Sequence, residues 1–361
     1  MKDDSASYFD SQEFLDLLSM YENMLAEGSS VYFDSMDIAN IAEFYSINGQ
    51  LDKSDTAIEY GLRLHPLDAD ILISKANNLL RRGHKEEARV IAESITDTQN
   101  QELLYLKGEI ELAFDNTQEA DALFMKAVQL SDDDPGMLND IIVKYMDNRQ
   151  YDLCQKWLDM ALLLSPDSRN FIELQADLFF DTGQADTAIE WYNHLLDEFA
   201  YDTYYWEQLG RIYYEKNDFP QARECFEFIE AIEPENKSAL MMKAGCIFNM
   251  EEWNEAYDIY KVLLADDNTS YTLLYYCGRC LYETGRYALA YDHFMDALAM
   301  LMLDTDVPQE MFTELYYYLA DSAYMTDSMD QARSFLYQGL ALDPDDEDLK
   351  RIAAKILPEQ Q

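Results

Sequence analysis

Two cysteines three positions apart, in Cys277-Gly-Arg-Cys280, have a spacing that suits metal or redox chemistry. Thiols at this spacing ligate zinc or exchange disulfides in many proteins. A structural zinc ion needs four ligands, and no second cysteine pair or histidine cluster accompanies these two residues. Buried cysteines are also common as small apolar residues within helices. We therefore interpret both cysteines as structural and predict that the protein has no metal site.

Other signatures of catalysis are missing from the sequence. It contains no Gly-rich phosphate loop, no nucleophile elbow and no zinc-protease motif. Acidic runs such as 132–134 lie at predicted helix boundaries, where carboxylates cap exposed amides. The sequence therefore predicts neither a cofactor nor enzymatic activity. We expect surface or turn positions for the four histidines, which are His65, His84, His194 and His293.

The amino-acid composition indicates which classes of binding partner are favoured. The 361 residues include 71 Asp and Glu against 26 Lys and Arg, a formal net charge of −45. This charge serves either solubility or the attraction of a basic partner, and it disfavours binding to nucleic acid or to a membrane surface. Five cysteines, an odd number at low density, suit a reducing compartment. Without an apolar run long enough for a secretory signal or a membrane span, the sequence predicts a cytoplasmic protein.

A small residue recurs along most of the chain, usually every 34 residues. The recurring positions are Ser54, Ala88, Ala120, Cys154, Ala188, Ala222, Ala256, Ala290 and Ala332. If these are position 20 of a 34-residue unit, position 8 is Ala or Gly in every unit except at Ile142. Apolar side chains at helical spacing surround both columns. Each unit is thus predicted to be two amphipathic helices that approach closely at the small residues.

Glycines and prolines fall where this period requires the chain to turn. Position 15, where a residue in the left-handed conformation can end the first helix, holds Gly49, Gly83, Gly183 and Gly285. Position 32, where the second helix should stop, holds Pro66, Pro166, Pro234 and Pro344. The turn residues therefore support the same period as the small residues.

One unit, at 203–236, carries the pattern most completely. In order, it contains Trp206, Leu209, Gly210, Tyr213, Phe219, Ala222, Phe226 and Pro234. This pattern closely resembles the tetratricopeptide-repeat signature, and the resemblance covers about residues 35–346. It implies an all-α fold: an α-solenoid of about nine helical hairpins that form a right-handed superhelix.

The chain ends and one insertion depart from the repeat. A capping box that starts at Asp10 predicts a helix over residues 10–28, which would cover the first repeat. We expect the following order: an N-terminal capping helix and linker at 1–34, repeats 1 to 8 at 35–302, an insertion at 303–312, repeat 9 at 313–346, and a C-terminal capping helix and tail at 347–361.

In the tetratricopeptide family, positions 2, 5, 6, 9, 12 and 13 of the first helix line a concave groove. Here the only basic residues at those positions are Arg81, Arg211 and Arg279, whereas acids are frequent and include Glu43, Asp70, Glu102, Glu109 and Asp140. One role in the family, the capture of an acidic C-terminal carboxylate of a heat-shock chaperone, uses Lys and Asn side chains. That cationic clamp is absent here. We therefore expect a partner that is basic or that has apolar or aromatic anchors.

The groove positions of the last four repeats collect tyrosines, together with two arginines at position 9. Tyrosine rings are rigid amphipathic anchors at many interfaces, and arginine can orient the carboxylates or carbonyls of a partner. An alternative is that these rings pack between neighbouring repeats. The candidate partner-binding residues are Tyr204, Arg211, Tyr214, Tyr275, Tyr276, Arg279, Tyr282, Tyr317, Tyr318 and Tyr324.

These features predict a protein–protein interaction scaffold or adaptor that binds a partner peptide or helix in the concave groove. One alternative is a peptide-sensing regulatory protein that uses the same array and needs a pocket enclosing its ligand. A second alternative, an enzyme with an unrecognised site, has no positive support in the sequence.

Overall fold

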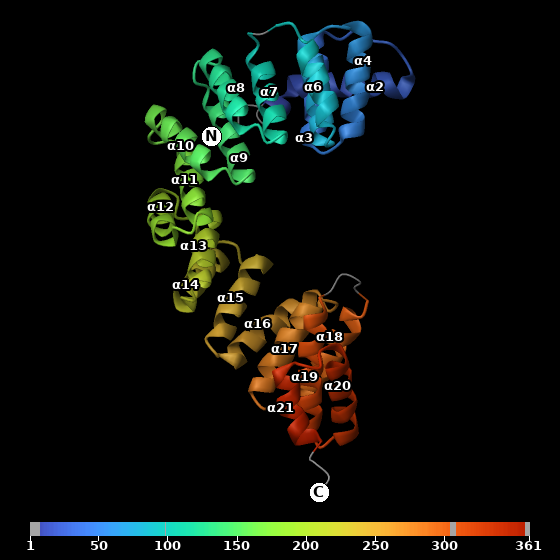
Figure 1. Cartoon of the computed structure of the whole chain (residues 1–361), viewed down its shortest axis with the longest axis vertical. Helices are drawn as coiled ribbons and strands as arrows, with labels where there is room; N and C mark the ends of the chain where they lie inside the picture. Colours follow the sequence, from blue (N-terminus) through green and yellow to red (C-terminus); the bar gives the residue numbers. More distant parts are fainter. Residues whose placement is uncertain (1–7, 98, 304–307, 358–361) are drawn as a thin grey trace. The chain divides into compact units, whose positions relative to one another are not determined.

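A computed structural model describes residues 8–97, 99–303 and 308–357. Within these ranges the regular structure is helical, with α2 to α21 following one another along the chain and no β-strand (Figure 1). The chain divides into two compact units, Met1–Leu174 and Gln175–Gln361, and the division falls inside α11 (Arg169–Asp181). The expected all-α solenoid of helical hairpins is thereby confirmed.

The first unit contains a capping helix, α2 (Gln12–Glu27), followed by four hairpins of adjacent helices that pack on each other. The hairpins consist of α3 (Ser35–Ile47) with α4 (Leu51–Leu64), α5 (Ala69–Arg81) with α6 (Lys85–Ser94), α7 (Gln101–Ala113) with α8 (Thr117–Leu130), and α9 (Pro135–Asp147) with α10 (Tyr151–Leu164).

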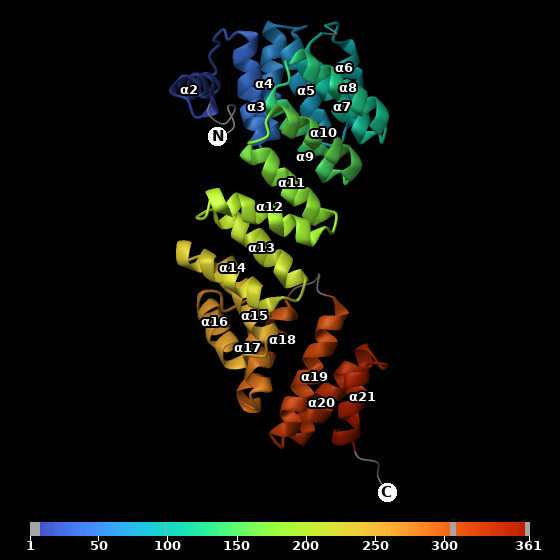
Figure 2. The ribbon, with the colours of Figure 1, turned by 90° about the vertical axis from the view of Figure 1, so that its left-hand side faces the viewer.

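The second unit continues the same arrangement after α11, whose Phe179 ring packs on Trp191 of α12 (Ala185–Glu198) at a centroid distance of 5.8 Å. The final helix, α21 (Glu347–Ile356), packs on both helices of the last hairpin (Figure 2). The hairpins of this unit are α13 (Thr203–Glu215) with α14 (Phe219–Ile232), α15 (Lys237–Asn249) with α16 (Trp253–Asp266), α17 (Tyr271–Glu283) with α18 (Tyr287–Leu301), and α19 (Gln309–Met325) with α20 (Met329–Leu342).

All nine turns within the hairpins use a left-handed residue at position 15. The glycines expected there have φ between 71° at Gly49 and 81° at Gly83. The remaining turns place a residue with a side chain in the same conformation: Asp115, Arg149, Asn217, Glu251 and Asp327. Backbone hydrogen bonds close each turn in the same way; at the first, the Gln50 amide donates to the Tyr45 carbonyl at 2.8 Å. The repeat therefore requires a backbone conformation at position 15 and not a particular side chain.

We expect Arg149→Gly and Glu251→Gly each to raise the free energy of unfolding by roughly 0.5–1 kcal/mol, because glycine adopts a left-handed φ without the steric cost that other residues bear. The reverse change, Gly285→Ala, should lower it by about 1 kcal/mol. A Cβ at Gly285 would meet no atom within 4 Å, so this loss would be purely conformational. Urea unfolding of the three variants measures the effect, and a neutral Gly285→Ala would show that position 15 carries no strain.

The size of the residue at position 8 of the repeat is related to the size of the residue at position 24 of the same unit. Three units have Gly at position 8, and each has Phe at position 24: Gly108 with Phe124, Gly210 with Phe226, and Gly278 with Phe294. A Cβ on these glycines would lie 2.5, 2.7 and 2.6 Å, respectively, from the nearest atom of the Phe ring. In these units, the aromatic ring therefore lies directly against the glycine of the facing helix.

The N-terminal capping helix begins one residue later than the predicted capping box requires. Ser11 is its N-cap, and the Ser11 hydroxyl accepts a hydrogen bond from the Phe14 amide at 3.2 Å. The helix then ends at Glu27, before Gly28 at a φ of 63°. Because Ser11 stands three residues before the amide that it caps, it takes the role that we expected of Asp10.

The segment 303–312, expected to be an insertion, partly forms a helix. Helix α19 begins at Gln309, so residues 309–312 add one turn to the first helix of the ninth hairpin. The Gln309 side chain donates to the carbonyl of Leu342 at 2.7 Å, which fastens this turn to the end of α20. Residues 304–307 lie outside the described part of the chain.

Candidate functional site

The ten candidate partner-binding residues all lie in the second unit, on the first helices of three hairpins. Helix α13 carries Tyr204, Arg211 and Tyr214; α17 carries Tyr275, Tyr276, Arg279 and Tyr282; and α19 carries Tyr317, Tyr318 and Tyr324. Their side chains are half-buried or exposed, so each retains some surface for a partner.

On α13, the candidates contact the preceding first helix, α11. The Tyr204 hydroxyl donates to the two carboxylate oxygens of Asp177 at 3.0 and 3.2 Å, and 37% of Tyr204 stays exposed. Burial raises the pKa of Asp177, and its hydrogen bonds from tyrosine hydroxyls oppose that rise. The Arg211 guanidinium lies over the Phe180 ring at 5.7 Å. Tyr204 and Arg211 therefore belong to a surface formed by α11 and α13.

Tyr214, the third candidate on α13, faces the next first helix instead. Its hydroxyl accepts a hydrogen bond from the side-chain amide of Asn249 in α15, at 3.0 Å. Its ring packs edge-on against Phe219, with the centroids 5.3 Å apart. Tyr214 thus links neighbouring repeats, as the packing alternative predicted for some of these rings.

Arg279 lies at the centre of a cluster formed by α15, α17 and α19. One guanidinium nitrogen donates to the Tyr275 hydroxyl at 2.7 Å and lies 3.4 Å from Glu314. The guanidinium also lies over the rings of Tyr318, at 4.6 Å, and Phe248, at 5.4 Å. Only 19% of the Arg279 side chain is exposed, so its charge is largely neutralised within the protein.

Two further tyrosines of α17 also pack between repeats. The Tyr276 ring stacks on Tyr260 at a centroid distance of 5.2 Å and an interplanar angle of 13°. The Tyr282 hydroxyl donates to Asp321 of α19, and its ring packs edge-on against Tyr318 at 5.1 Å. Burial, followed by the hydrogen bond to Asp321, raises the pKa of Tyr282. These contacts give both rings a structural role.

Two of the three α19 candidates, Tyr317 and Tyr318, line a cavity of about 320 Å³. The cavity lies between α19 and the connection from α20 to α21. Its other lining residues are Gln309, Glu310, Thr313, Glu314, Asp343, Asp346 and Asp348. All five charged residues of this lining are acids. Tyr324 lies two turns further along α19 and packs against the apolar core shared with α20 and α21.

Except for Glu314, the acidic residues of this cavity lie outside the groove positions of the repeat. Asp346 is the N-cap of α21: its carboxylate accepts a hydrogen bond from the Leu349 amide at 2.7 Å. Glu310 lies in the segment expected to be an insertion, outside the repeat positions that we searched. Its spacing of four from Glu314 and seven from Tyr317 places all three on one helix face, a signal that was available in the sequence.

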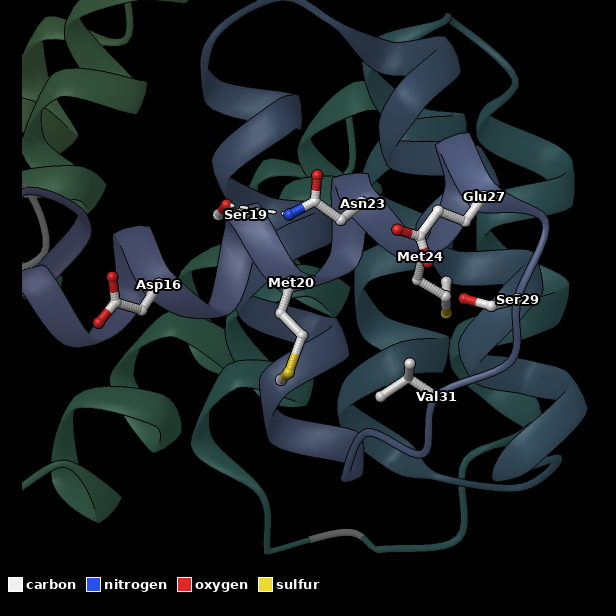
Figure 3. A pocket seen from close by; sticks show the side chains of 8 residues that line it. All are labelled: Asp16, Ser19, Met20, Asn23, Met24, Glu27, Ser29 and Val31. Atoms are coloured by element: carbon white, nitrogen blue, oxygen red, sulfur yellow. Dashed lines mark hydrogen bonds between the residues drawn. The ribbon is translucent and has the colours of Figure 1, made fainter.

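A second cavity, of about 360 Å³, lies in the first unit on the capping helix. Figure 3 shows that Met20 and Met24 of α2 point to one side of the helix, toward Val31 in the segment that follows it. Asp16 and Glu27 also line this cavity, whereas no aromatic side chain does. Met24 is buried in the same core cluster as Phe14 and Tyr21, and Val31 packs against that cluster, so the apolar wall of this cavity borders the core.

The first unit also carries an acidic face made by successive first helices. Burial, the charge of Glu102 on α7 and that of Asp140 on α9 raise the pKa of Glu43 on α3, and Arg81 opposes this shift. Burial and the charge of Asp70 on α5 raise the pKa of Glu102. The carboxylates of four helices therefore act on one another, and this face has a negative potential that favours cations.

No reactive site emerges at the cysteines. Cys277 and Cys280 are fully buried in α17, and burial raises the pKa of both thiols to about 12. All five cysteines are buried. Among the described residues, no group of three or more His, Cys, Asp or Glu side chains is placed to hold a metal ion. The two thiols are thus part of the apolar core.

One histidine departs from the expected surface or turn position. His84 and His194 are exposed, and His65 lies just after α4, where its ring bonds to the Phe33 carbonyl at 3.0 Å. His293, by contrast, is half-buried in the middle of α18, and burial lowers its pKa. The expectation was therefore wrong for His293, because the helix places it against Tyr257 of the preceding hairpin.

The length and the apolar character of a helix decide whether it can span a membrane. None of the described helices combines the length and the apolar character that crossing a lipid bilayer requires.

Comparisons with known proteins agree with this architecture. Residues 216–297 match the family described as anaphase-promoting complex, cyclosome, subunit 3. No curated protein matches the chain. The C-terminal part of a tetratricopeptide-repeat-containing protein from Cytophaga hutchinsonii is 18% identical, with a TM-score of 0.58 over 71% of this chain and 100% of that chain. A tetratricopeptide repeat protein from Parabacteroides merdae is 15% identical, with a TM-score of 0.47 over 72% of this chain and 99% of that chain.

Within the described ranges, nine helical hairpins, each closed by the same left-handed turn, form a helical-repeat architecture. Its 34-residue period and its likeness to the Cytophaga hutchinsonii structure identify the fold as that of tetratricopeptide repeats. Folds of this kind present extended surfaces on which protein–protein interaction scaffolds are built.

Proposed function

We propose that this protein is a non-enzymatic scaffold or adaptor that binds a segment of a partner protein along the first helices of its second unit. The proposed contact surface consists of Tyr204, Arg211, Tyr214, Tyr275, Tyr276, Arg279, Tyr282, Tyr317, Tyr318 and Tyr324. The observation that carries the proposal is the cavity on α19, where Tyr317 and Tyr318 stand beside acidic side chains at a solvent-accessible position.

The members of this surface have different tasks. Tyr204 and Tyr317 expose ring and hydroxyl surface that a partner segment can cover, as interface tyrosines commonly do. Tyr275, Tyr276 and Tyr282 hold neighbouring helices together, the hydroxyls of Tyr275 and Tyr282 by donating to Glu314 and Asp321 of α19 and the Tyr276 ring by stacking on Tyr260. They act by keeping the surface rigid, which lowers the entropy that binding costs.

Charge determines which partners suit this surface. A net charge of −45 attracts basic segments over long range and repels nucleic acid. A partner with Lys or Arg beside an apolar or aromatic anchor therefore fits best. We place this encounter in the cytoplasm, because five cysteines, an odd number at low density, suit a reducing compartment.

The test is affinity capture from an extract of the producing cells, followed by binding of the purified partner. We expect Tyr204→Ala/Tyr317→Ala to weaken the partner's affinity at least about tenfold, because each truncated anchor costs on the order of 1 kcal/mol or more. Tyr201→Ala/Tyr337→Ala is the matched control: both rings are well exposed, at 85% and 57%, and lie outside the proposed surface. Circular dichroism checks the fold. Equal affinity for both double variants would reject the proposed surface.

A further inference from the structure

We propose that the cavity between α19 and the α20–α21 connection binds an arginine side chain of the partner segment. This inference rests on the proposed function and specifies the chemistry that the partner brings to one part of the surface. The cavity, called the α19 pocket below, has the lining residues and the volume of about 320 Å³ given above.

The negative charge of the α19 pocket favours a cationic ligand. Glu310 and Glu314 come from adjacent turns of α19. Opposite them, Asp343 and Asp346 come from the connection between α20 and α21, and Asp348 comes from the first turn of α21. Within the described residues, Glu310 forms no ion pair. Several carboxylates held together repel one another, and a bound cation removes that repulsion. An apolar or acidic side chain would leave these groups uncompensated.

The protein's own cations reach the edges of this pocket but do not line it. Arg351 bonds to the Tyr317 hydroxyl at 3.3 Å and to Asp348 at 2.7 Å, with 64% of its side chain exposed. Arg279 approaches Glu314 from the side of α17. Two arginines therefore offset part of the charge of five acids, and the pocket stays acidic.

The same side chains already hold one arginine within the protein. The Arg279 guanidinium lies over the Tyr318 ring and beside Glu314, and both of these residues also line the α19 pocket. The pocket adds Tyr317 and Glu310 to that pair. The Tyr318 ring is already covered by Arg279 and by the stacked Phe294 ring, so a second guanidinium would meet the same kind of groups at Tyr317 and Glu310.

Arginine fits this lining better than lysine. Its planar guanidinium can form paired hydrogen bonds with carboxylates and stack on an aromatic ring at the same time. A lysine ammonium is a compact, strongly hydrated charge that gains less from the tyrosine walls. The hydroxyl oxygen of Thr313 and the amide oxygen of Gln309, which also line the pocket, can accept further guanidinium N–H groups.

The experiment uses the full chain and three fluorescein-labelled heptapeptides of Gly and Ser with one central residue: arginine, lysine or citrulline. Citrulline keeps the shape of arginine and removes its charge. Fluorescence anisotropy at physiological ionic strength, where long-range attraction is screened, measures each dissociation constant. We expect the arginine peptide to bind at least about tenfold more tightly than the citrulline peptide and severalfold more tightly than the lysine peptide.

A charge-matched pair of variants locates the binding. Glu310→Gln/Asp343→Asn removes two carboxylates from the pocket, and the Asn can still accept the hydrogen bond from the Asp345 amide, 2.9 Å in the wild type. Glu59→Gln/Glu93→Gln removes the same charge from exposed sites on the first unit. We expect the pocket variant to bind the arginine peptide at least about tenfold more weakly and the control to bind it within about twofold of wild type.

Several results would overturn the inference. Equal binding of arginine and citrulline peptides would reject a charged ligand, and equal binding of arginine and lysine would reject the preference for a guanidinium. Equal weakening by both charge variants would show that only the overall field attracts the peptide. If Tyr204→Ala/Tyr317→Ala loses the partner while the pocket variant binds the arginine peptide like wild type, the proposed function stands and the arginine pocket is rejected.

Discussion

Replacing Tyr282 with alanine should lower the free energy of unfolding of the second unit by roughly 3 kcal/mol. The ring packs against Tyr287 and Tyr318 at centroid distances of 5.4 and 5.1 Å, so its loss opens a cavity between α17 and α19. The hydroxyl is also the donor to Asp321, which is only 5% exposed. Without that donor, the buried Asp321 carboxylate keeps neither oxygen satisfied, since its Oδ1 already has no partner.

A double-mutant cycle separates the two contributions. Tyr282→Phe keeps the ring and removes the donor. We expect it to lower the free energy of unfolding by about 1–3 kcal/mol, because the buried carboxylate is left unsatisfied. Tyr282→Phe/Asp321→Leu removes both polar partners and should recover part of that loss. Urea unfolding, with hydrogen exchange of the α17 and α19 amides, measures the effect in the unit concerned. A Tyr282→Phe variant as stable as wild type would show that the hydrogen bond contributes nothing.

Gly278→Ala should destabilise the second unit by roughly 1–2 kcal/mol, although alanine is the better helix former by about 1 kcal/mol. The new Cβ would lie 2.6 Å from a ring carbon of Phe294, which is fully buried and stacked on Tyr318. One of the two helices must therefore shift. The stability change is measured by urea unfolding.

Two further variants test this explanation. Gly245→Ala, also in the middle of a first helix, places its Cβ 3.7 Å from Tyr214, an ordinary contact, and should stabilise the protein. Gly278→Ala/Phe294→Leu recreates the Ala320 and Leu336 pairing of the ninth repeat and should be more stable than the sum of its single changes. Destabilisation by Gly245→Ala, or strict additivity in the double variant, would contradict a steric match between positions 8 and 24.

Tyrosines that hold helices together are poor positions at which to test partner binding by mutation. Truncation of Tyr275 or Tyr282 removes hydrogen bonds to Arg279 or Asp321, and any lost binding could then follow from disturbed helices. Tyr204, which is 37% exposed, and Tyr317, which lines the α19 pocket, are better placed to meet a partner, although each also hydrogen-bonds to a neighbouring helix, through Asp177 and Arg351. The number of solvent-facing positions in a repeat therefore overstates the number of residues that meet a partner.

Much of the fold could be predicted because each unit of a repeat protein contacts mainly the units that precede and follow it in the sequence. Small residues at positions 8 and 20, and glycines such as Gly49 and Gly285, marked both helices and the turn of each unit. The sequence also contains the pairing of Gly at position 278 with Phe at position 294. Its reason, that the Phe294 ring lies directly against the glycine, becomes clear only in the structure.

The candidate site was less predictable, because it depends on side-chain partners from different hairpins. Spacing alone placed Tyr282 on the groove face, but not its hydrogen bond to Asp321. Glu310 was overlooked because α19 starts four residues before the repeat boundary that the period predicts. Side chains long enough to cross between helices decide such contacts, and a periodic pattern carries no information about them.

The burial of every cysteine makes the molecule suited to site-specific labelling. A thiol with a pKa of about 12 is almost entirely protonated at pH 7, so maleimide dyes should leave Cys277 and Cys280 of the folded chain unmodified. Ser334→Cys, at an exposed position of α20, would then carry a single dye without any change to the native cysteines. A fluorophore there would report on the hairpin that forms the α19 pocket while the rest of the array keeps its natural sequence.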